Sequence, residues 1–304
     1  MRRLHILVDQ WGWNAENHAD ALRLWSPPNW EITTSLWNGE NHAWNDDHEP
    51  DVILNIGTQR QAALKEQVEE FNPILLSRFY CCYPRNKDKL ENLLKYSDMV
   101  LVESRLCHER CSYLGAIRLT PTGVDCTAFR SYILPWKRAK KALWCAGIGG
   151  SNKGRASVKQ PGLAEKVRKL LKPRGIELDI KIVDPHGERL NRQQMVEWYN
   201  TGRVYLCTSE SEGVPNTALE AAACGCAIVS TRVGRMLEVV QDGKNGYLFS
   251  LNAKELADAV ELACNRYEWM AYDVHRIILQ SDWRRLAKHY YDLMDKLCSS
   301  NQRT

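Results

Sequence analysis

Short apolar runs alternate with segments of helical periodicity along the first 133 residues of the chain. A continuous apolar run is typical of a buried strand, and strands that alternate with helices indicate a parallel β-sheet with right-handed crossovers. The pattern predicts strands at 4–8, 30–36, 51–56, 73–77 and 99–103. It predicts helices at 15–25 and 61–71 and around Leu90 and Leu106.

The alternation stops at residues 131–141, which we interpret as a linker because SYILPWKRAKK holds a proline and several basic residues. Beyond it, strands are expected at 142–146, 178–183, 204–207 and 227–230. Helices are expected at 162–172, 192–200, 217–223, from about Ala253 onward, and at 283–297. The chain is therefore expected to be an α/β protein with parallel-sheet domains at 1–133 and 134–282 and a C-terminal helix within 283–304. Ligands of open parallel sheets bind beyond the carboxyl ends of the strands, so two facing domains would hold a ligand between them.

The composition is that of a globular protein, with 304 residues, 44% hydrophobic and 26% charged. No apolar run approaches the roughly 18 residues of a membrane span, and the first residues lack the apolar segment of a signal peptide. Eleven cysteines without such a leader indicate reduced thiols. We expect a cytoplasmic protein, or one of the host cytoplasm if phage-encoded, and peripheral contact with a membrane stays open. A secreted disulfide scaffold and an integral membrane protein are not expected.

The net charge of +4 is unevenly divided between the two expected domains. Residues 1–133 hold 14 basic and 18 acidic residues, whereas 134–304 hold 27 and 19. This division suits domains with different ligands, the second ligand being anionic, although chance scatter of surface charge would also produce it. Tryptophan is concentrated in the first domain.

The segment 209–234 carries the most informative motif. A strand end leads into a loop with two carboxylates, then into a helix that opens near Asn216, then into another strand. Asn216 is the predicted N-cap and Thr217 lies in the first turn, where free amides suit a phosphate. Glu212 and Glu220 can reach different parts of one extended ligand, and a carboxylate accepts paired hydrogen bonds from vicinal hydroxyls.

This motif resembles the nucleotide-binding signature of the retaining GT-B glycosyltransferases of family GT4, the glycosyl transferases group 1. Glu212 and Glu220 match its E-x7-E pattern, which Gly225 and a strand follow. Residues 238–246, EVVQDGKNG, resemble E-x-V-x-D-G-x-N-G, and 122–129, TGVDCTAF, resemble N-G-V-D-x-x-x-F. The motifs occur in the family's order over most of 98–250. A non-enzymatic Rossmann-like protein with coincidental spacing is the alternative.

The resemblance implies the GT-B fold, in which two Rossmann-like domains face each other across a cleft and the C-terminal helix returns to the first domain. It implies that Glu220 binds the ribose of a nucleotide-diphosphate sugar and that Glu212 lies beside the transferred sugar. The amides of Gly213 and Val214 would face the sugar or the diphosphate. It implies retaining transfer without a cofactor or a bound metal. The cysteine spacings also lack a zinc pattern.

Members of the family usually carry an arginine and a lysine–glycine pair after the first strand of the second domain, where they neutralise the diphosphate. Here that strand ends near Gly147, and Lys153, Arg155 and Lys159 follow. We favour Lys159 as the catalytic lysine because it lies just before Pro161, a good first helical residue. Lys153 is followed by glycine and stays a candidate, as does Arg155 for the arginine. An ordinary solvated basic loop is the alternative.

The first domain, short at 133 residues, is expected to face the acceptor. Gly12 would allow close backbone approach after the first strand, and Trp11 and Trp13 would stack on a sugar or a base or cover the end of the core. Arg78 stands near where the family often has a histidine, and it is the remaining acceptor-side candidate. His5 and His18 are expected to be structural.

Three possible functions remain open at this point. The acceptor is a glycan or lipid-linked saccharide in the favoured hypothesis. A phage-type enzyme acting on hydroxymethylated bases of DNA is the second, since the basic run 137–141 would hold phosphates. A catalytically inert protein that binds sugar nucleotides is the third.

Overall fold

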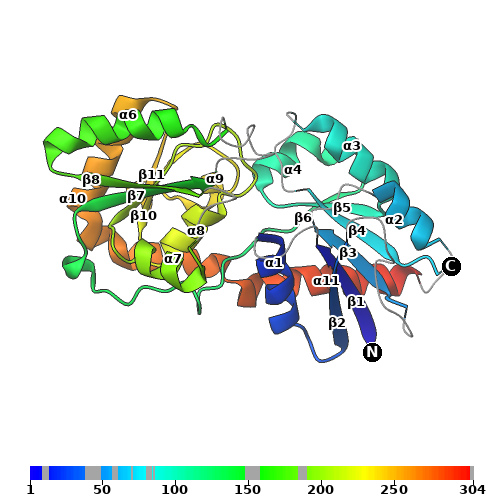
Figure 1. Cartoon of the computed structure of the whole chain (residues 1–304). Coiled ribbons are helices and arrows are strands. Elements are labelled where there is room, and N and C mark those ends of the chain that lie inside the picture. Colours follow the sequence, from blue (N-terminus) through cyan, green and yellow to red (C-terminus); the bar gives the residue numbers. More distant parts are fainter. Residues whose placement is uncertain are drawn as a thin grey trace. The chain divides into compact units, whose positions relative to one another are not determined.

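A computed structural model describes residues 1–8, 14–37, 49–56, 61–69, 71–79, 84, 86–147, 158–183 and 190–301. The chain divides into two compact units (Figure 1). Unit 1 comprises Met1–Gly123 and Trp283–Thr304, and unit 2 comprises Val124–Asp282. No helix in the described part of the chain has both the length and the hydropathy of a membrane span.

The described part of unit 1 contains a parallel sheet of six strands in the order β2-β1-β3-β4-β5-β6. Its strands are β1 (Arg2–Val8), β2 (Trp30–Leu36), β3 (Val52–Ile56), β4 (Ile74–Phe79), β5 (Met99–Val102) and β6 (Ile117–Leu119). β3 and β4 are buried along their whole length, as continuous apolar runs predict. The five strands predicted in this region are confirmed, and β6 is an additional strand at the sheet edge.

Helices cover both faces of this sheet. They are α1 (Asn14–Leu24), α2 (Gln61–Gln67), α3 (Lys87–Tyr96), α4 (Arg105–Cys111) and the C-terminal α11 (Trp283–Asn301). The apolar side of α11 packs with α1 and the sheet through buried residues that include Trp283 and Met294. Tyr290 and Tyr291 donate hydrogen bonds to the carbonyls of Thr120 (3.0 Å) and Leu22 (2.7 Å). The predicted return of the C-terminal helix to the first domain is therefore confirmed.

Unit 2 contains, over its described residues, a parallel sheet of five strands in the order β11-β10-β9-β7-β8. The strands are β7 (Lys141–Gly147), β8 (Glu177–Val183), β9 (Val204–Cys207), β10 (Ala227–Thr231) and β11 (Gly246–Phe249). The helices are α6 (Pro161–Leu171), α7 (Arg192–Tyr199), α8 (Asn216–Ala223), α9 (Met236–Val239) and α10 (Ala253–Ile278).

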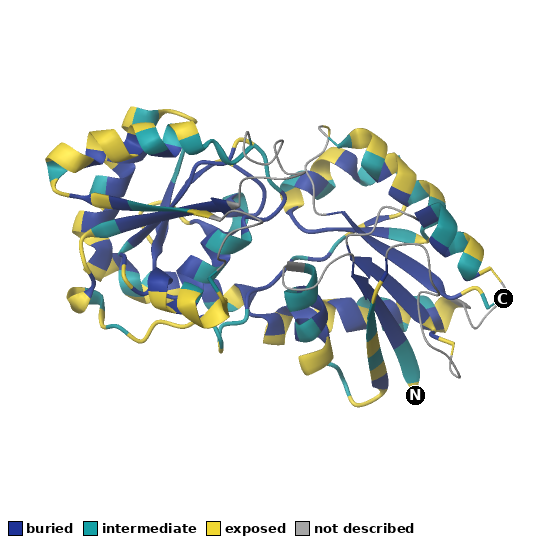
Figure 2. Cartoon of the chain, viewed as in Figure 1, coloured by how far each residue is buried: buried dark blue, intermediate teal, exposed yellow. Residues whose placement is uncertain are grey.

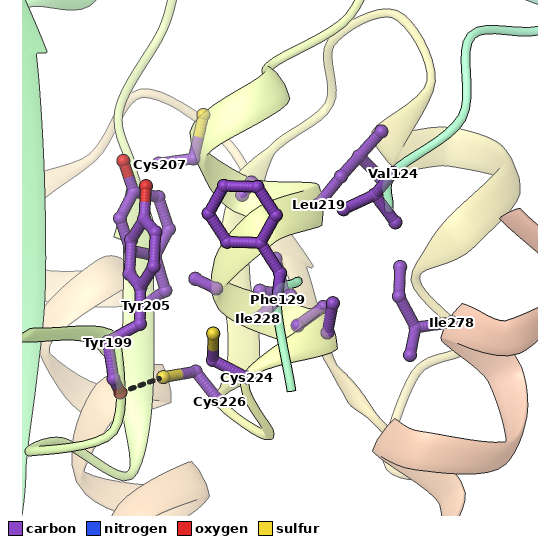
Figure 3. Close-up of a cluster of buried hydrophobic side chains, with 14 of the residues drawn as sticks. Val124, Phe129, Tyr199, Tyr205, Cys207, Leu219, Cys224, Cys226, Ile228 and Ile278 are labelled. Atoms are coloured by element: carbon purple, nitrogen blue, oxygen red, sulfur yellow. Dashed lines mark hydrogen bonds between the residues drawn. The ribbon is translucent and has the colours of Figure 1, made fainter. Parts of the chain in front are cut away.

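Two hydrophobic clusters lie on opposite faces of the unit 2 sheet, because successive strand residues alternate in direction. Leu143 packs with α7 and α8 on one face, whereas Trp144 packs with α6 and α10 on the other. Figure 2 shows the buried strands inside and the exposed outer faces of the helices. Figure 3 shows part of the first cluster.

The predicted linker at 131–141 is wrong, because this segment is built into unit 2. Arg138 is only 3% exposed, and its guanidinium donates to the Gly202 carbonyl (2.9 Å), to Asn200 Oδ1 (2.8 Å) and to the Cys224 carbonyl. Lys141 belongs to β7 and pairs with Asp179 at 2.9 Å. Two members of the basic run expected to hold DNA phosphates are thus engaged within the protein.

The first division between the units falls at Gly123, whereas the sequence placed a boundary at residue 133. Residues just after Gly123 contribute to the core of unit 2. Val124 and Phe129 are both buried in the cluster with Tyr199 and Leu219. The backbone N–H of Val124 also bonds the Ser281 carbonyl at 2.9 Å, close to the second crossing of the chain at Asp282.

Candidate functional site

The segment before α6 is held against the carboxyl end of β9. The Thr208 hydroxyl donates to the Lys159 carbonyl at 2.7 Å and accepts from Nε1 of Trp144 at 2.9 Å. The Glu210 amide donates to the Val158 carbonyl at 2.8 Å. These bonds fix the backbone of Lys159 beside the loop 208–215, which joins β9 to α8.

The two residues predicted to be catalytic contact each other here, Glu212 from this loop and Lys159 from the segment beside it. Nζ of Lys159 forms an ion pair with Oε1 of Glu212, to which the Ser209 hydroxyl also donates at 2.5 Å. The side chains of Lys159 and Glu212 are 23% and 13% exposed, so neither is fully buried in the core. Burial would lower the pKa of Lys159, but the charge and hydrogen bond of Glu212 outweigh burial and raise it. Lys159 therefore carries a positive charge near neutral pH.

The far side of the loop packs against residues 231–235. The Thr231 hydroxyl donates to the Ser209 carbonyl, and the Arg235 amide donates to the Gly213 carbonyl at 2.9 Å. Gly234 has a φ of +41°, and a Cβ there would collide with the carbonyl oxygen of Gly213. Sequence reasoning missed the supporting role of Gly234, for which the only signal was its place at the end of the motif.

The beginning of α8 differs from the prediction. Pro215, not Asn216, is the N-cap, and it makes no side-chain cap. Its carbonyl accepts hydrogen bonds from the amides of Ala218 (3.0 Å) and Leu219 (3.3 Å), so Asn216 is the first helical residue. The amides of a first turn have no acceptor within their own helix, and this applies to Asn216 and Thr217. The Thr217 hydroxyl accepts from Tyr205 at 2.8 Å.

Glu220 lies in the middle of α8, where its carboxylate Oε2 accepts a 2.9 Å hydrogen bond from the Tyr199 hydroxyl. Burial raises the pKa of Glu220 to about 7, although Tyr199, Arg192 and Lys159 each act to lower it.

The side chain of Val214 points into the core and is buried with Leu219. Only its backbone therefore suits the predicted role.

Two other motif segments fold through local hydrogen bonds. Oδ1 of Asp125 accepts from the amides of Thr127 (2.9 Å) and Ala128 (3.1 Å) and thereby shapes the turn before Phe129. In the segment 238–246, Nδ2 of Asn245 donates to the Val239 carbonyl at 2.8 Å. Asp125 and Asn245 therefore stabilise the turns in which these two motif segments fold.

The remaining predicted residues fall into two groups. Gly147 is the last residue of β7 and pairs in register with Val183 of β8. Five candidates lie outside the described residues, namely Trp11, Gly12, Trp13, Lys153 and Arg155. Within the described ranges, no group of His, Cys, Asp or Glu has the arrangement of a metal site.

Arg78, the acceptor-side candidate, is buried in unit 1. Its guanidinium forms an ion pair with Glu103 and donates to the Thr122 hydroxyl at 3.3 Å. These partners give Arg78 a structural role, and an acceptor-side role stays a prediction. His18 is also buried, with its ring 4.5 Å from that of Trp283, and burial holds its pKa well below the usual value.

Comparison with known proteins bears on unit 2 most directly. Residues 136–265 match the family model "Glycosyl transferases group 1" and include Lys159, Glu212 and Glu220. A D-inositol 3-phosphate glycosyltransferase of Arthrobacter is 27% identical over 172 residues, which are 48% of this chain and 41% of that protein. A probable sucrose-phosphate synthase of Thermosipho melanesiensis is 27% identical over 111 residues, 35% of this chain and 26% of that protein. The matches cover less than half the length of these relatives.

Solved structures resemble the chain over nearly its whole length. Sucrose-phosphate synthase from Thermosynechococcus elongatus has a TM-score of 0.70 at 14% identity, covering 99% of this chain and 100% of that one. Anabaena HepE, solved in complex with UDP and glucose, has a TM-score of 0.76 at 12% identity, covering 97% and 100%. The chain thus has the GT-B fold, and residues 136–265 of its second unit are similar to the group 1 glycosyltransferases.

Proposed function

We propose that the protein is a retaining glycosyltransferase of family GT4 that transfers a sugar from a nucleotide-diphosphate sugar to an acceptor hydroxyl. The observation that carries this proposal is the pairing of Lys159 with Glu212, close enough to Glu220 for Lys159 to lower its pKa. The group 1 match over 136–265 supports it, as does the UDP complex of the structurally similar HepE.

The donor would lie along the loop 208–215 and the start of α8. Glu220 would accept hydrogen bonds from the ribose hydroxyls, since a carboxylate presents two acceptor oxygens to a vicinal diol. The amides of Gly213, Val214, Asn216 and Thr217 would face the sugar or the diphosphate, where the helix dipole favours negative charge. Gly147, Lys153 and Arg155 complete the donor site in this proposal.

In the reaction, the bond between the anomeric carbon and the diphosphate oxygen breaks while the acceptor oxygen forms a bond to the same face of the sugar. The Lys159 ammonium stabilises the negative charge that develops on the departing diphosphate. The acceptor hydroxyl gives its proton to an oxygen of that leaving group. Glu212 positions the sugar and stabilises the positive charge that develops at the anomeric carbon. Lys159 and the α8 amides supply the positive charge, so we include neither a cofactor nor a metal.

The acceptor is proposed to be a glycan or a lipid-linked saccharide. Trp11, Gly12 and Trp13 are the residues of unit 1 that we assign to it, with Arg78 as a further candidate. Modified DNA is the less favoured acceptor, because Arg138 and Lys141 of the basic run are bonded within unit 2. A salt-sensitive gel shift with duplex DNA would instead favour DNA as the acceptor.

The experiment is incubation of the protein with a panel of nucleotide sugars and candidate saccharide acceptors, followed by mass spectrometry of the products. NMR of the new glycosidic bond then reports its anomeric configuration. Transfer with the configuration of the donor retained supports the proposal. Inversion contradicts the retaining mechanism, and binding of a nucleotide sugar without any turnover identifies an inert binding protein.

A further inference from the structure

We propose that Tyr199 positions the Glu220 carboxylate for the donor ribose and thereby makes the site selective for ribonucleotides over 2′-deoxyribonucleotides. This assignment rests on the proposed function, in which Glu220 binds the ribose. Tyr199 itself is not proposed to contact the reacting atoms, so it is a positioning residue. Tyr199 lies outside the sequence motifs, so this role was not predicted from the sequence.

Packing holds the Tyr199 ring in place at the end of α7. The side chain is fully buried, and its ring lies 5.9 Å from that of Tyr205 in an edge-on arrangement. The rings of Trp198 and Phe129 lie 5.3 Å and 6.3 Å away. Figure 3 shows Tyr199 and Tyr205 side by side, with Phe129 next to them. The phenol therefore donates from a fixed position.

The carboxylate that receives this hydrogen bond has little else to orient it. Among the described residues, Tyr199 is the one hydrogen-bond donor to Glu220, at 2.9 Å to Oε2. A carboxylate otherwise rotates about its last bond, and a donor on one oxygen fixes the plane of both. Oε1 and the second lone pair of Oε2 then face a fixed direction, as recognition of the two hydroxyls of one ribose requires.

The same hydrogen bond affects the charge of Glu220. Burial raises the pKa of Glu220 to about 7, and the Tyr199 hydroxyl opposes this rise. Removal of the hydroxyl should therefore raise the pKa further and leave less carboxylate at neutral pH. The titratable and charged groups that act on Glu220 or respond to its charge come from several elements: Tyr199, Arg192, Lys159, Cys145 and Cys224.

The test compares Tyr199→Phe with the unaltered protein by isothermal titration calorimetry. The probes are UDP, ADP and GDP with their 2′-deoxy counterparts, and the pair that binds most tightly is used. Tyr267→Phe is the matched control, because it also removes a buried tyrosine hydroxyl from unit 2, one that donates to the Gly225 carbonyl at 2.7 Å. Thermal unfolding of both variants checks that they fold equally well.

Tyr199→Phe should weaken ribonucleotide binding by about fivefold to tenfold, the value of one typical intramolecular hydrogen bond. It should weaken deoxyribonucleotide binding less, so the preference for ribose falls, and it should move the pH midpoint of ribonucleotide binding upward. Tyr267→Phe should leave the preference and the midpoint unchanged. In a Glu220→Gln background, Tyr199→Phe should add less than about a twofold loss, because the two residues act together.

An unchanged ribose preference and pH midpoint in Tyr199→Phe overturn the inference. If Glu220→Gln does lower the preference in that case, the proposed donor site survives and only the role of Tyr199 is lost. If Glu220→Gln has no effect either, both fail. Should Tyr199→Phe not fold, the unaltered protein still tests the premise of the inference, the ribose-binding carboxylate of Glu220: its ribonucleotide affinity should fall more steeply than its deoxyribonucleotide affinity as the pH drops below about 7. Parallel pH profiles overturn the inference.

Discussion

Nζ of Lys159 and Oε1 of Glu212 form an ion pair that joins the segment before α6 to the loop after β9. The pair is partly exposed, and the Ser209 hydroxyl steadies the carboxylate from within the loop. A cation and an anion held side by side suit a reaction in which opposite charges develop on two neighbouring parts of one substrate.

Lys159→Ala should lower the kcat for sugar transfer by about 10²- to 10³-fold, because the departing diphosphate loses its cation. The KM for the donor should change less than kcat. Lys166→Ala is the control, since Lys166 is an exposed lysine on α6. Steady-state kinetics of donor consumption check the prediction, and equal kcat values for the two variants would show that Lys159 does not act on the leaving group.

Glu220→Gln should stabilise the fold near neutral pH although it weakens donor binding. The folded-state pKa of Glu220, about 7, lies above that of an unfolded glutamate, so the native state binds the proton more tightly. Its contribution to stability therefore falls as the pH rises from about 4.5 to about 7.

We expect Glu220→Gln to raise the free energy of unfolding by about 1–3 kcal/mol at about pH 8 and to change it little at about pH 5. Urea denaturation at both pH values measures this. Glu197→Gln, at an exposed position of α7, should show no such pH dependence. A destabilised Glu220→Gln protein at the higher pH would contradict the buried-carboxylate account.

Gly234→Ala should destabilise the protein by about 2–4 kcal/mol, because its Cβ would collide with the loop carbonyl of Gly213 at a positive φ. Gly162→Ala is the matched substitution in α6, where a Cβ meets open space, and it should be neutral or stabilising by up to about 1 kcal/mol. Thermal denaturation distinguishes the two. Equal melting temperatures would contradict the prediction, because they would mean that the loop moves at Gly213 without a cost in stability.

Arg138→Met should cost about 3–5 kcal/mol, since it leaves the buried acceptors Gly202, Asn200 and Cys224 without their donor. Arg138→Lys should not restore stability, because an ammonium cannot reach the same set of acceptors. Lys137→Met removes an exposed charge from the same run and should change stability by less than about 0.5 kcal/mol. Chemical denaturation of the three variants provides the measurement.

Most strands of both units could be predicted because buried parallel strands are continuous apolar runs. β6 and β11 were missed, since one is three residues long with the polar Arg118 inside it and the other is four residues beyond a turn. The site pair Glu212 and Glu220 could be found because both belong to one local motif. Lys159 was favoured from its place before Pro161, and the structure puts it beside Glu212.

What could not be predicted depends on contacts between distant parts of the chain. The guanidinium of Arg138 donates to three backbone carbonyls in two other segments, 199–202 and 224, and nothing in its own basic surroundings indicates burial. Tyr199 meets Glu220 only because α7 and α8 pack together. Asn216 is a good N-cap by residue type, but Pro215 occupies that position because its carbonyl starts the helix.

The most direct test of the central claim is the rate at which the purified protein releases nucleoside diphosphate from a nucleotide sugar, measured with an isotope-labelled donor panel. We predict release by the unaltered protein, an increase in donor KM of about tenfold or more in Glu220→Ala, and a loss of kcat in Lys159→Ala. Donor consumption that is equal in the unaltered protein and both variants, or absent from all three, would contradict the claim that these residues form a sugar-nucleotide transfer site.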